Sequence, residues 1–274
     1  MKRIFSVIIC IILLCICVIG CQKQSYEKSE KIIVGYGDDF SEIPLFNMEN
    51  KEEYLKSSQK YRLVFVMDPL CGACKKQLQT INSFRMFYEP YLDVSIIWEN
   101  NVIEDSILEQ YDIPKDINYL LGIDKISITT PTVLIIGKDN KVCFESVDME
   151  SIALKLNTLE GVSIEAVRGN VCNYFNKINS TDKKSLVYFA LQGCSDCEKA
   201  DKIIDKDIEE KYDVMKIYDS DAYGEEEYVD IDNIYQAIFN IDWYPSFLIL
   251  EGGNEYQFVG KTDVQKLKDI LLNL

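Results

Sequence analysis

The stretch Arg62-Leu-Val-Phe-Val-Met67, followed by Asp68-Pro69-Leu70 and Cys71-Gly-Ala-Cys74, decides how the first half of the chain is interpreted. The apolar run has the length of a buried strand, and Asp-Pro is a turn signal. Behind the motif, apolar residues recur at helical spacing, at Cys74, Leu78, Ile81 and Tyr88. The pattern therefore predicts a strand, a turn and a cysteine pair that opens a helix.

The chain continues from this motif with a strand, a hairpin and a closing helix. An X-Pro step, Thr130-Pro131, comes directly before the hairpin, and Gly161 follows the closing helix as a stop signal. The predicted strands are Leu92 to Trp98, Thr132 to Ile136 and Val142 to Glu145, and the helix carries Ile152, Leu156 and Leu159.

The second half repeats this order. A strand leads into Cys194-Ser-Asp-Cys197, and Tyr244-Pro245 comes directly before the second hairpin. The strands are Leu186 to Ala190, Val214 to Tyr218, Ser246 to Leu250 and Tyr256 to Val259, and the final helix carries Val264, Leu267 and Leu271. We therefore predict an α/β fold of two domains, 35–161 and 162–274, each a mixed β-sheet with helices on both faces.

Strand, CxxC at a helix start, strand, X-Pro before a hairpin and terminal helix together resemble the thioredoxin fold, twice. The first copy, with Ile43-Pro-Leu-Phe-Asn-Met48 ahead of its motif, is similar to TlpA/ResA-like thiol–disulfide oxidoreductases. The second is similar to thioredoxin and protein disulfide isomerase domains. The resemblance implies that both X-Pro bonds are cis and that Thr130, Pro131, Tyr244 and Pro245 contact the bound polypeptide.

The chemistry expected of these motifs is thiol–disulfide exchange. The thiolate is the nucleophile, and a helix N-terminus stabilises it. Cys71 and Cys194 stand where their helices begin, so each should attack the substrate. Cys74 and Cys197 lie three residues on and should close back to release the mixed disulfide. The alternative is that either pair is only a structural disulfide.

Two differences from thioredoxin concern the surroundings of the cysteines. Thioredoxin has a buried Asp six residues before its first cysteine, which helps to move protons; here those positions are Phe65 and Tyr188. Proton transfer must then use another group or water, or be slow. Thioredoxin's Trp before the motif is Leu70 in one copy and Gly193 in the other.

The N-terminus has the order of a secretory signal. Lys2 and Arg3 precede an apolar run from Ile4 to Ile19, and Val18-Ile-Gly-Cys21 resembles a bacterial lipobox. We expect 1–21 to be a lipoprotein signal, with Cys21 lipidated, and 22–34 to be a tether. The folded part would lie outside the cytoplasm, anchored to the cell membrane by lipid. An uncleaved membrane anchor is the alternative, although the run is short for a span.

Composition restricts the partners and the chemistry. The formal net charge of −16 opposes binding to nucleic acid and to anionic lipid head groups. The chain has no histidine, which excludes Cys–His catalysis and a His-ligated zinc or copper site, and we expect no metal and no cofactor. The acidic run Asp219 to Asp232 is interpreted as a solvated loop, with recognition of basic substrates as the weaker alternative.

We therefore expect a membrane-tethered reductase or isomerase whose substrates are protein or peptide disulfides and whose electrons pass to or from a redox partner in the membrane. The alternative is a chaperone-like or accessory lipoprotein that binds polypeptides with inert cysteines. Cys143 is interpreted as a buried apolar residue, and an inter-domain disulfide with Cys172 is an open alternative in an oxidising compartment.

Overall fold

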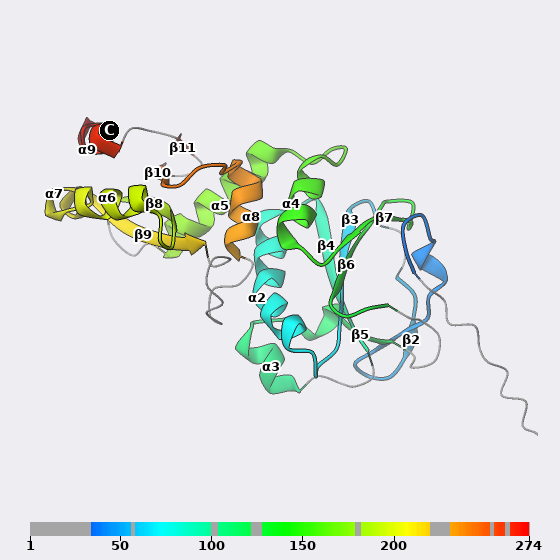
Figure 1. The fold of residues 1–274 in the computed structure, drawn as a ribbon. Coiled ribbons are helices and arrows are strands. Elements are labelled where there is room, and N and C mark those ends of the chain that lie inside the picture. Colours follow the sequence, from blue (N-terminus) through cyan, green and yellow to red (C-terminus); the bar gives the residue numbers. More distant parts are fainter. Residues whose placement is uncertain are drawn as a thin grey trace, which may run out of the picture.

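The computed structural model describes residues 34–55, 58–99, 104–121, 128–178, 182–219, 231–252, 255–260 and 264–273. Within these ranges the strands form a seven-stranded sheet of order β2-β1-β5-β4-β3-β6-β7 and a four-stranded sheet of order β11-β10-β8-β9 (Figure 1). The strands of the first sheet are β1 (Leu45–Asn47), β2 (Glu52–Glu53), β3 (Tyr61–Met67), β4 (Leu92–Trp98), β5 (Asn118–Leu121), β6 (Thr132–Ile136) and β7 (Val142–Ser146). Those of the second are β8 (Lys184–Leu191), β9 (Tyr212–Asp219), β10 (Ser246–Gly252) and β11 (Glu255–Val259).

The helices predicted at the two cysteine motifs and at the end of each half are present, and further helices lie between them. The helices of the first half are η1 (Phe40–Glu42), α2 (Gly72–Phe87), α3 (Asp105–Gln110), η2 (Lys115–Ile117) and α4 (Met149–Asn157). Those of the second half are α5 (Ile164–Ile178), α6 (Ser195–Ile203), α7 (Lys206–Lys211), α8 (Ile231–Phe239) and α9 (Val264–Asn273).

The two sheets share one arrangement of four strands. In the first, β3 pairs parallel with β4 and antiparallel with β6, and β6 pairs antiparallel with β7. In the second, β8 pairs parallel with β9 and antiparallel with β10, and β10 pairs antiparallel with β11. The order strand, helix, strand, hairpin and helix that was predicted from the sequence is thus present twice.

Burial on both faces explains why β3 and β8 are almost wholly apolar. In β3, Leu63 and Phe65 point into one core while Val64 points into the other. In β8, Val187 points into the same core as Leu63 and Phe65, and Tyr188 points into a separate core on the opposite face of the sheet. Successive side chains of a strand point to opposite faces, so a central strand covered on both faces needs apolar residues at every position.

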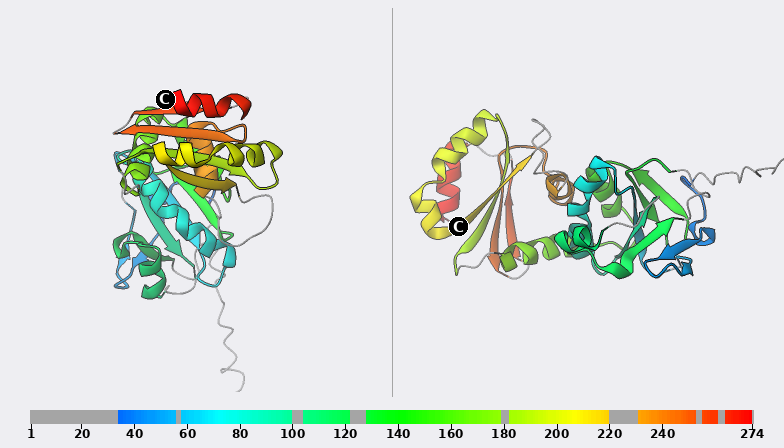
Figure 2. Two further views of the ribbon diagram at one scale, coloured as in Figure 1. Left: turned by 90° about the vertical axis from the view of Figure 1, so that its left-hand side faces the viewer. Right: turned by 90° about the horizontal axis from the view of Figure 1, so that it is seen from below.

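A single apolar core lies between the two sheets, filled by helices from both halves (Figure 2). Phe87 of α2 contacts Tyr174 of α5 and Tyr235 of α8, with ring centroids 5.7 Å apart in each pair. The side-chain amide of Asn157 donates to the carbonyl of Ala237 at 3.0 Å. Helices α6, α7 and α9 pack on the far face of the four-stranded sheet.

The first sheet differs from the expectation of helices on both faces. Its outer face is covered by the segment 34–55, in which η1 is the one regular helix among the described residues. Val34, which was expected to end the tether, is buried in this outer core together with Phe40 and Leu45. The strands β1, β2 and β5, which extend the sheet, were not predicted from the sequence.

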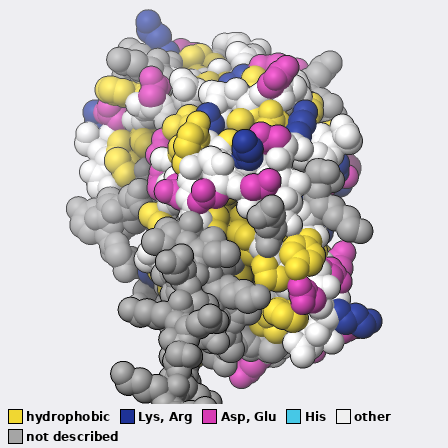
Figure 3. Space-filling model, turned by 90° about the vertical axis from the view of Figure 1, so that its right-hand side faces the viewer, with side chains coloured by type: hydrophobic (Ala, Val, Ile, Leu, Met, Phe, Trp, Pro, Cys, Tyr) yellow, Lys and Arg dark blue, Asp and Glu magenta, His cyan; other side chains and the backbone are white. Residues whose placement is uncertain are grey.

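The expected signal 1–21, the lipidation site Cys21 and tether residues 22–33 lie outside the described residues, as does most of the acidic run between Asp219 and Asp232. In the described part, no helix combines the length and the apolar character needed to cross a bilayer. On the face that lies opposite the four-stranded sheet, acidic side chains are spread among apolar ones (Figure 3).

Candidate redox sites at two cysteine pairs

The first cysteine pair begins helix α2. Cys71 is the N-cap, in extended conformation, and its Sγ accepts a hydrogen bond from the Cys74 amide at 3.2 Å. Unpaired amides at a helix N-terminus present partial positive charge, which favours a thiolate placed there. Cys71 is partly accessible, whereas Cys74 is 1% exposed. The pair thus has one sulfur open to a substrate and one sulfur buried behind it.

The second pair has the same geometry. Cys194 caps α6, and its Sγ accepts from the Cys197 amide at 3.1 Å. Cys194 is partly accessible and Cys197 is 3% exposed. All four cysteines are free thiols in the structure.

A cis X-Pro bond lies against each accessible sulfur. The Thr130-Pro131 and Tyr244-Pro245 bonds are both cis, as the resemblance implied. The Sγ of Cys71 lies 4.0 Å from the carbonyl oxygen of Thr130, and that of Cys194 lies 3.9 Å from the carbonyl oxygen of Tyr244. The structure therefore brings together, at each site, residues that are about 50 to 60 positions apart in the sequence. A third cis bond, Glu89-Pro90, was not expected.

Burial keeps the inner cysteines protonated. It raises the pKa of the Cys74 thiol to about 12, and likewise that of Cys197 to about 12. At neutral pH each inner cysteine is a thiol, so the partly accessible Cys71 and Cys194 are the sulfurs available for the first attack.

The rims of the two sites carry exposed apolar side chains and opposite charges. Leu70, beside Cys71, is 84% exposed, and Trp243, two residues before Pro245, is 41% exposed. Lys75 and Lys76 are exposed behind the first motif. In the second motif Asp196 pairs with Lys199 at 2.7 Å, and Glu198 is exposed.

Cys143 and Cys172 are separate free thiols, so the alternative of a disulfide between them is not realised in the structure. Cys143 on β7 is half-buried and donates to the carbonyl of Ile135 at 3.3 Å. Cys172 on α5 is fully buried, and burial raises the pKa of its thiol to about 12. Both are packing residues, as was expected of Cys143.

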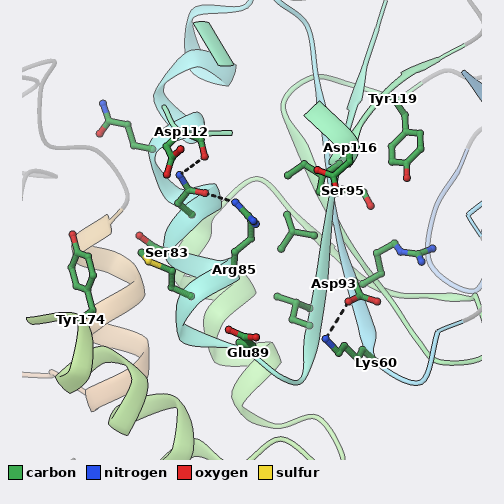
Figure 4. A pocket seen from close by; sticks show the side chains of 17 residues that line it. Lys60, Ser83, Arg85, Glu89, Asp93, Ser95, Asp112, Asp116, Tyr119 and Tyr174 are labelled. Atoms are coloured by element: carbon green, nitrogen blue, oxygen red, sulfur yellow. Dashed lines mark hydrogen bonds and ion pairs between the residues drawn. The ribbon is translucent and has the colours of Figure 1, made fainter. Parts of the chain in front are cut away.

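Two polar features were not found from the sequence. One is a cleft of about 890 Å³ between α2 and β4 (Figure 4). Within it Lys60 pairs with Asp93 at 3.5 Å, and Arg85 donates to Asn82 at 2.8 Å. Neither cysteine pair lines it. The other is an ion pair between Asp201 and Lys216, which lies beneath the second site.

No family model and no curated protein matches the chain. Several solved structures resemble part of it. A thioredoxin domain of a thiol–disulfide oxidoreductase from Bacteroides vulgatus is 15% identical, with a TM-score of 0.35, over 41% of this chain and 89% of that chain. StoA from Bacillus subtilis is 12% identical, with a TM-score of 0.30, over 38% and 84%.

A further similar structure is a secreted disulfide oxidoreductase from Mycobacterium tuberculosis, which is 10% identical, with a TM-score of 0.30, over 38% of this chain and 82% of that chain. Similarities this weak carry no information on activity. Any inference about activity therefore rests on the geometry of the two cysteine pairs.

Proposed function

We propose that this protein is an extracytoplasmic thiol–disulfide oxidoreductase built from two thioredoxin-like domains, 35–161 and 162–274, with catalytic pairs Cys71/Cys74 and Cys194/Cys197. The observation that carries the proposal is the repeated geometry of the pairs. In each, an accessible sulfur caps a helix, its partner lies buried within the first turn, and a cis X-Pro carbonyl lies against the outer sulfur. A structural disulfide needs only the two cysteines and explains none of the other features.

The reaction at either pair is a two-step exchange. The thiolate of Cys71 attacks a substrate disulfide, forms a mixed disulfide and expels one substrate thiolate, which takes up a proton. Cys74 then loses its proton and attacks Cys71 Sγ, closing the Cys71–Cys74 disulfide and releasing the second substrate sulfur. The substrate gains two electrons and the pair loses two. Run in reverse, the same steps oxidise a substrate dithiol.

The substrate class that fits is an extended polypeptide. Peptide groups of Thr130 and Tyr244, next to the outer sulfurs, would pair with the backbone of the bound chain. Leu70 and Trp243 expose apolar surface beside the sites, which suits unfolded chains with apolar residues near the disulfide.

The proposed attachment to the membrane rests on the lipoprotein signal expected at residues 1–21. Lipidation of Cys21 would hold the protein at the outer surface of the cytoplasmic membrane, where a membrane redox partner can reset the pairs. Replacing Cys21 by Ser should release the protein into the soluble extracytoplasmic fraction without changing the activity of the purified protein. Retention of the Cys21→Ser protein in the membrane would favour an uncleaved anchor.

Reduction of insulin by dithiothreitol separates this function from the polypeptide-binding alternative. The wild-type protein should accelerate the reduction, and the Cys71→Ser/Cys194→Ser variant should not. A Cys143→Ser variant is the matched control, because it removes a thiol that lies outside both sites. Equal rates for wild type and double variant, with client binding retained, would instead identify an inert binding protein.

A further inference from the structure

A buried tyrosine, a carboxylate and a lysine lie next to Cys197. Tyr188 of β8 is 0% exposed, and its hydroxyl donates to the Cys197 carbonyl at 2.9 Å. Asp201 stands one helical turn beyond Cys197 on α6. Lys216 lies opposite Tyr188 on the parallel strand β9, pairs with Asp201 and places Nζ 4.8 Å from the centroid of the Tyr188 ring.

The second step of exchange at this site requires that Cys197 lose a proton. Its thiol is 3% exposed, and burial raises its pKa to about 12. With a pKa near 12, only about one thiol in 10⁵ is ionised at pH 7. Because bulk water hardly reaches the sulfur, a proton acceptor inside the protein would accelerate the step.

We infer that Tyr188 and Asp201 form that route. The tyrosine hydroxyl, which is within hydrogen-bonding reach of the Cys197 and Asp201 side chains, turns from the Cys197 carbonyl to the Asp201 carboxylate, passes its proton there and takes the proton of the Cys197 thiol. This inference rests on the proposed function and concerns the second pair alone. Tyr188 contacts the residue that reacts, and Asp201 acts through it as the final acceptor of the proton. Lys216 holds the carboxylate in place.

The electrostatics agree with a hydroxyl that relays a proton and does not ionise itself. Burial, and then the neighbouring Asp201 and Cys197, raise the pKa of Tyr188 above its ordinary value. The titratable and charged groups around it are Cys194, Cys197 and Asp201 from α6 and Lys216 from β9. From β10, the ring of Phe247 stacks on Tyr188 at 4.8 Å.

Asp201 also connects the buried hydroxyl to solvent. Its side chain is 45% exposed and that of Lys216 is 23% exposed, so a proton received by Asp201 can pass on to water. In the full step, the proton leaves Cys197 for Asp201 and the thiolate attacks Cys194 Sγ. The bond between Cys194 and the substrate sulfur breaks, and that sulfur leaves with the electron pair and is protonated by water.

The first pair has no equivalent arrangement in the described part of the chain. Phe65 occupies the position of Tyr188 and packs on Phe84, 6.2 Å between ring centroids, so it offers no polar atom. The Cys74 sulfur instead accepts from the Asp68 amide at 3.5 Å, a group that cannot take a proton, and from the Thr130 side chain. The two pairs should therefore differ in the rate of their second step.

The test uses the full chain with Cys71→Ser and Cys74→Ser, so that the second pair acts alone. A peptide disulfide is mixed with the reduced protein, the reaction is quenched with acid at intervals, and the lifetime of the Cys194 mixed disulfide is measured by mass spectrometry from pH 6 to pH 9. Asp201→Asn and Tyr188→Phe are the test variants. Asp207→Asn is the control, since Asp207 is an exposed carboxylate of α7 that also pairs with a lysine.

The mixed disulfide should persist about tenfold longer or more at pH 7 in Asp201→Asn and in Tyr188→Phe, and no longer in Asp207→Asn. The difference should shrink toward pH 9, because hydroxide becomes a competing acceptor, and Asp201→Glu should restore most of the rate. Equal lifetimes in all proteins, or a ratio that stays constant with pH, would overturn the inference and leave the proposed function intact. If the parent protein forms no mixed disulfide at Cys194, the inference and the proposed exchange at the second pair both fail.

Discussion

Phe87 offers a way to test whether the two halves of the chain fold as one body. Its ring is 0% exposed at the end of α2 and contacts Tyr174 and Tyr235 from the other half of the chain. Truncation of a buried Phe to Ala costs about 3–5 kcal/mol, and in a protein of this size that corresponds to a fall in Tm of roughly 6–20 °C. We expect Phe87→Ala to lower the stability of both halves and to weaken the coupling between them.

The two tryptophans make this measurable by urea unfolding. Trp98 is buried in β4, and Trp243 lies in the second half, so Trp98→Phe and Trp243→Phe leave one reporter in each unit. The two reporters should unfold together in the parent and separately after Phe87→Ala. Phe247→Ala is the control, because it removes an equally buried ring from the far face of the four-stranded sheet. Separate transitions in the parent, or unchanged midpoints in Phe87→Ala, would refute the shared core.

Three further predictions concern the cysteines and their rims. Cys74→Ser and Cys197→Ser should each accumulate mixed disulfides with substrate chains, detected on non-reducing gels, and the absence of any adduct would count against exchange at that pair. The pKa of Cys172 is raised to about 12 in the folded protein, against about 9 in the unfolded chain. Because the unfolded chain loses this proton first, the stability that the buried thiol contributes is complete below pH 9 and is lost as the pH rises toward 12. Cys172→Ala should therefore flatten this alkaline loss in chemical denaturation of the reduced protein, and an unchanged slope would contradict the assignment. Leu70→Ser should reduce the rate with insulin severalfold and leave small aromatic disulfides unaffected; equal losses with both would argue against an apolar contact.

The sequence was informative where a feature depends on neighbours along the chain. Each cysteine motif follows an apolar strand and opens a helix, so its N-cap geometry could be predicted from spacing alone. The cis prolines followed from resemblance, because no local pattern specifies a cis bond. Short strands such as β1 and β2 carry too few residues for a period to be recognised.

Features that depend on tertiary contacts could not be predicted. Phe87 and Tyr235 are apolar positions on two helices, and the sequence of neither helix indicates that these two residues contact each other. The outer face of the first sheet was expected to carry helices, yet an extended segment with suitably placed apolar side chains fills the same role. Apolar periodicity identifies a face that must be buried but does not identify what buries it.

The difference between the two cysteine pairs also depends on tertiary contacts, so it could not be predicted from the sequence. Sequence places Phe65 and Tyr188 at equivalent positions and leaves open how protons leave Cys74 and Cys197. The answer at the second pair depends on a helix position, Asp201, and a strand register that sets Lys216 opposite Tyr188. If the inner cysteine of one pair has a proton acceptor and that of the other has none, mixed disulfides will last longer at the first pair. A long-lived adduct gives a misfolded chain time to rearrange, whereas a short-lived one favours net transfer of electrons. The two copies of one fold would then divide the work through three differences beneath the inner cysteine. Phe65, Leu78 and Ile96 of the first copy stand where the second has Tyr188, Asp201 and Lys216.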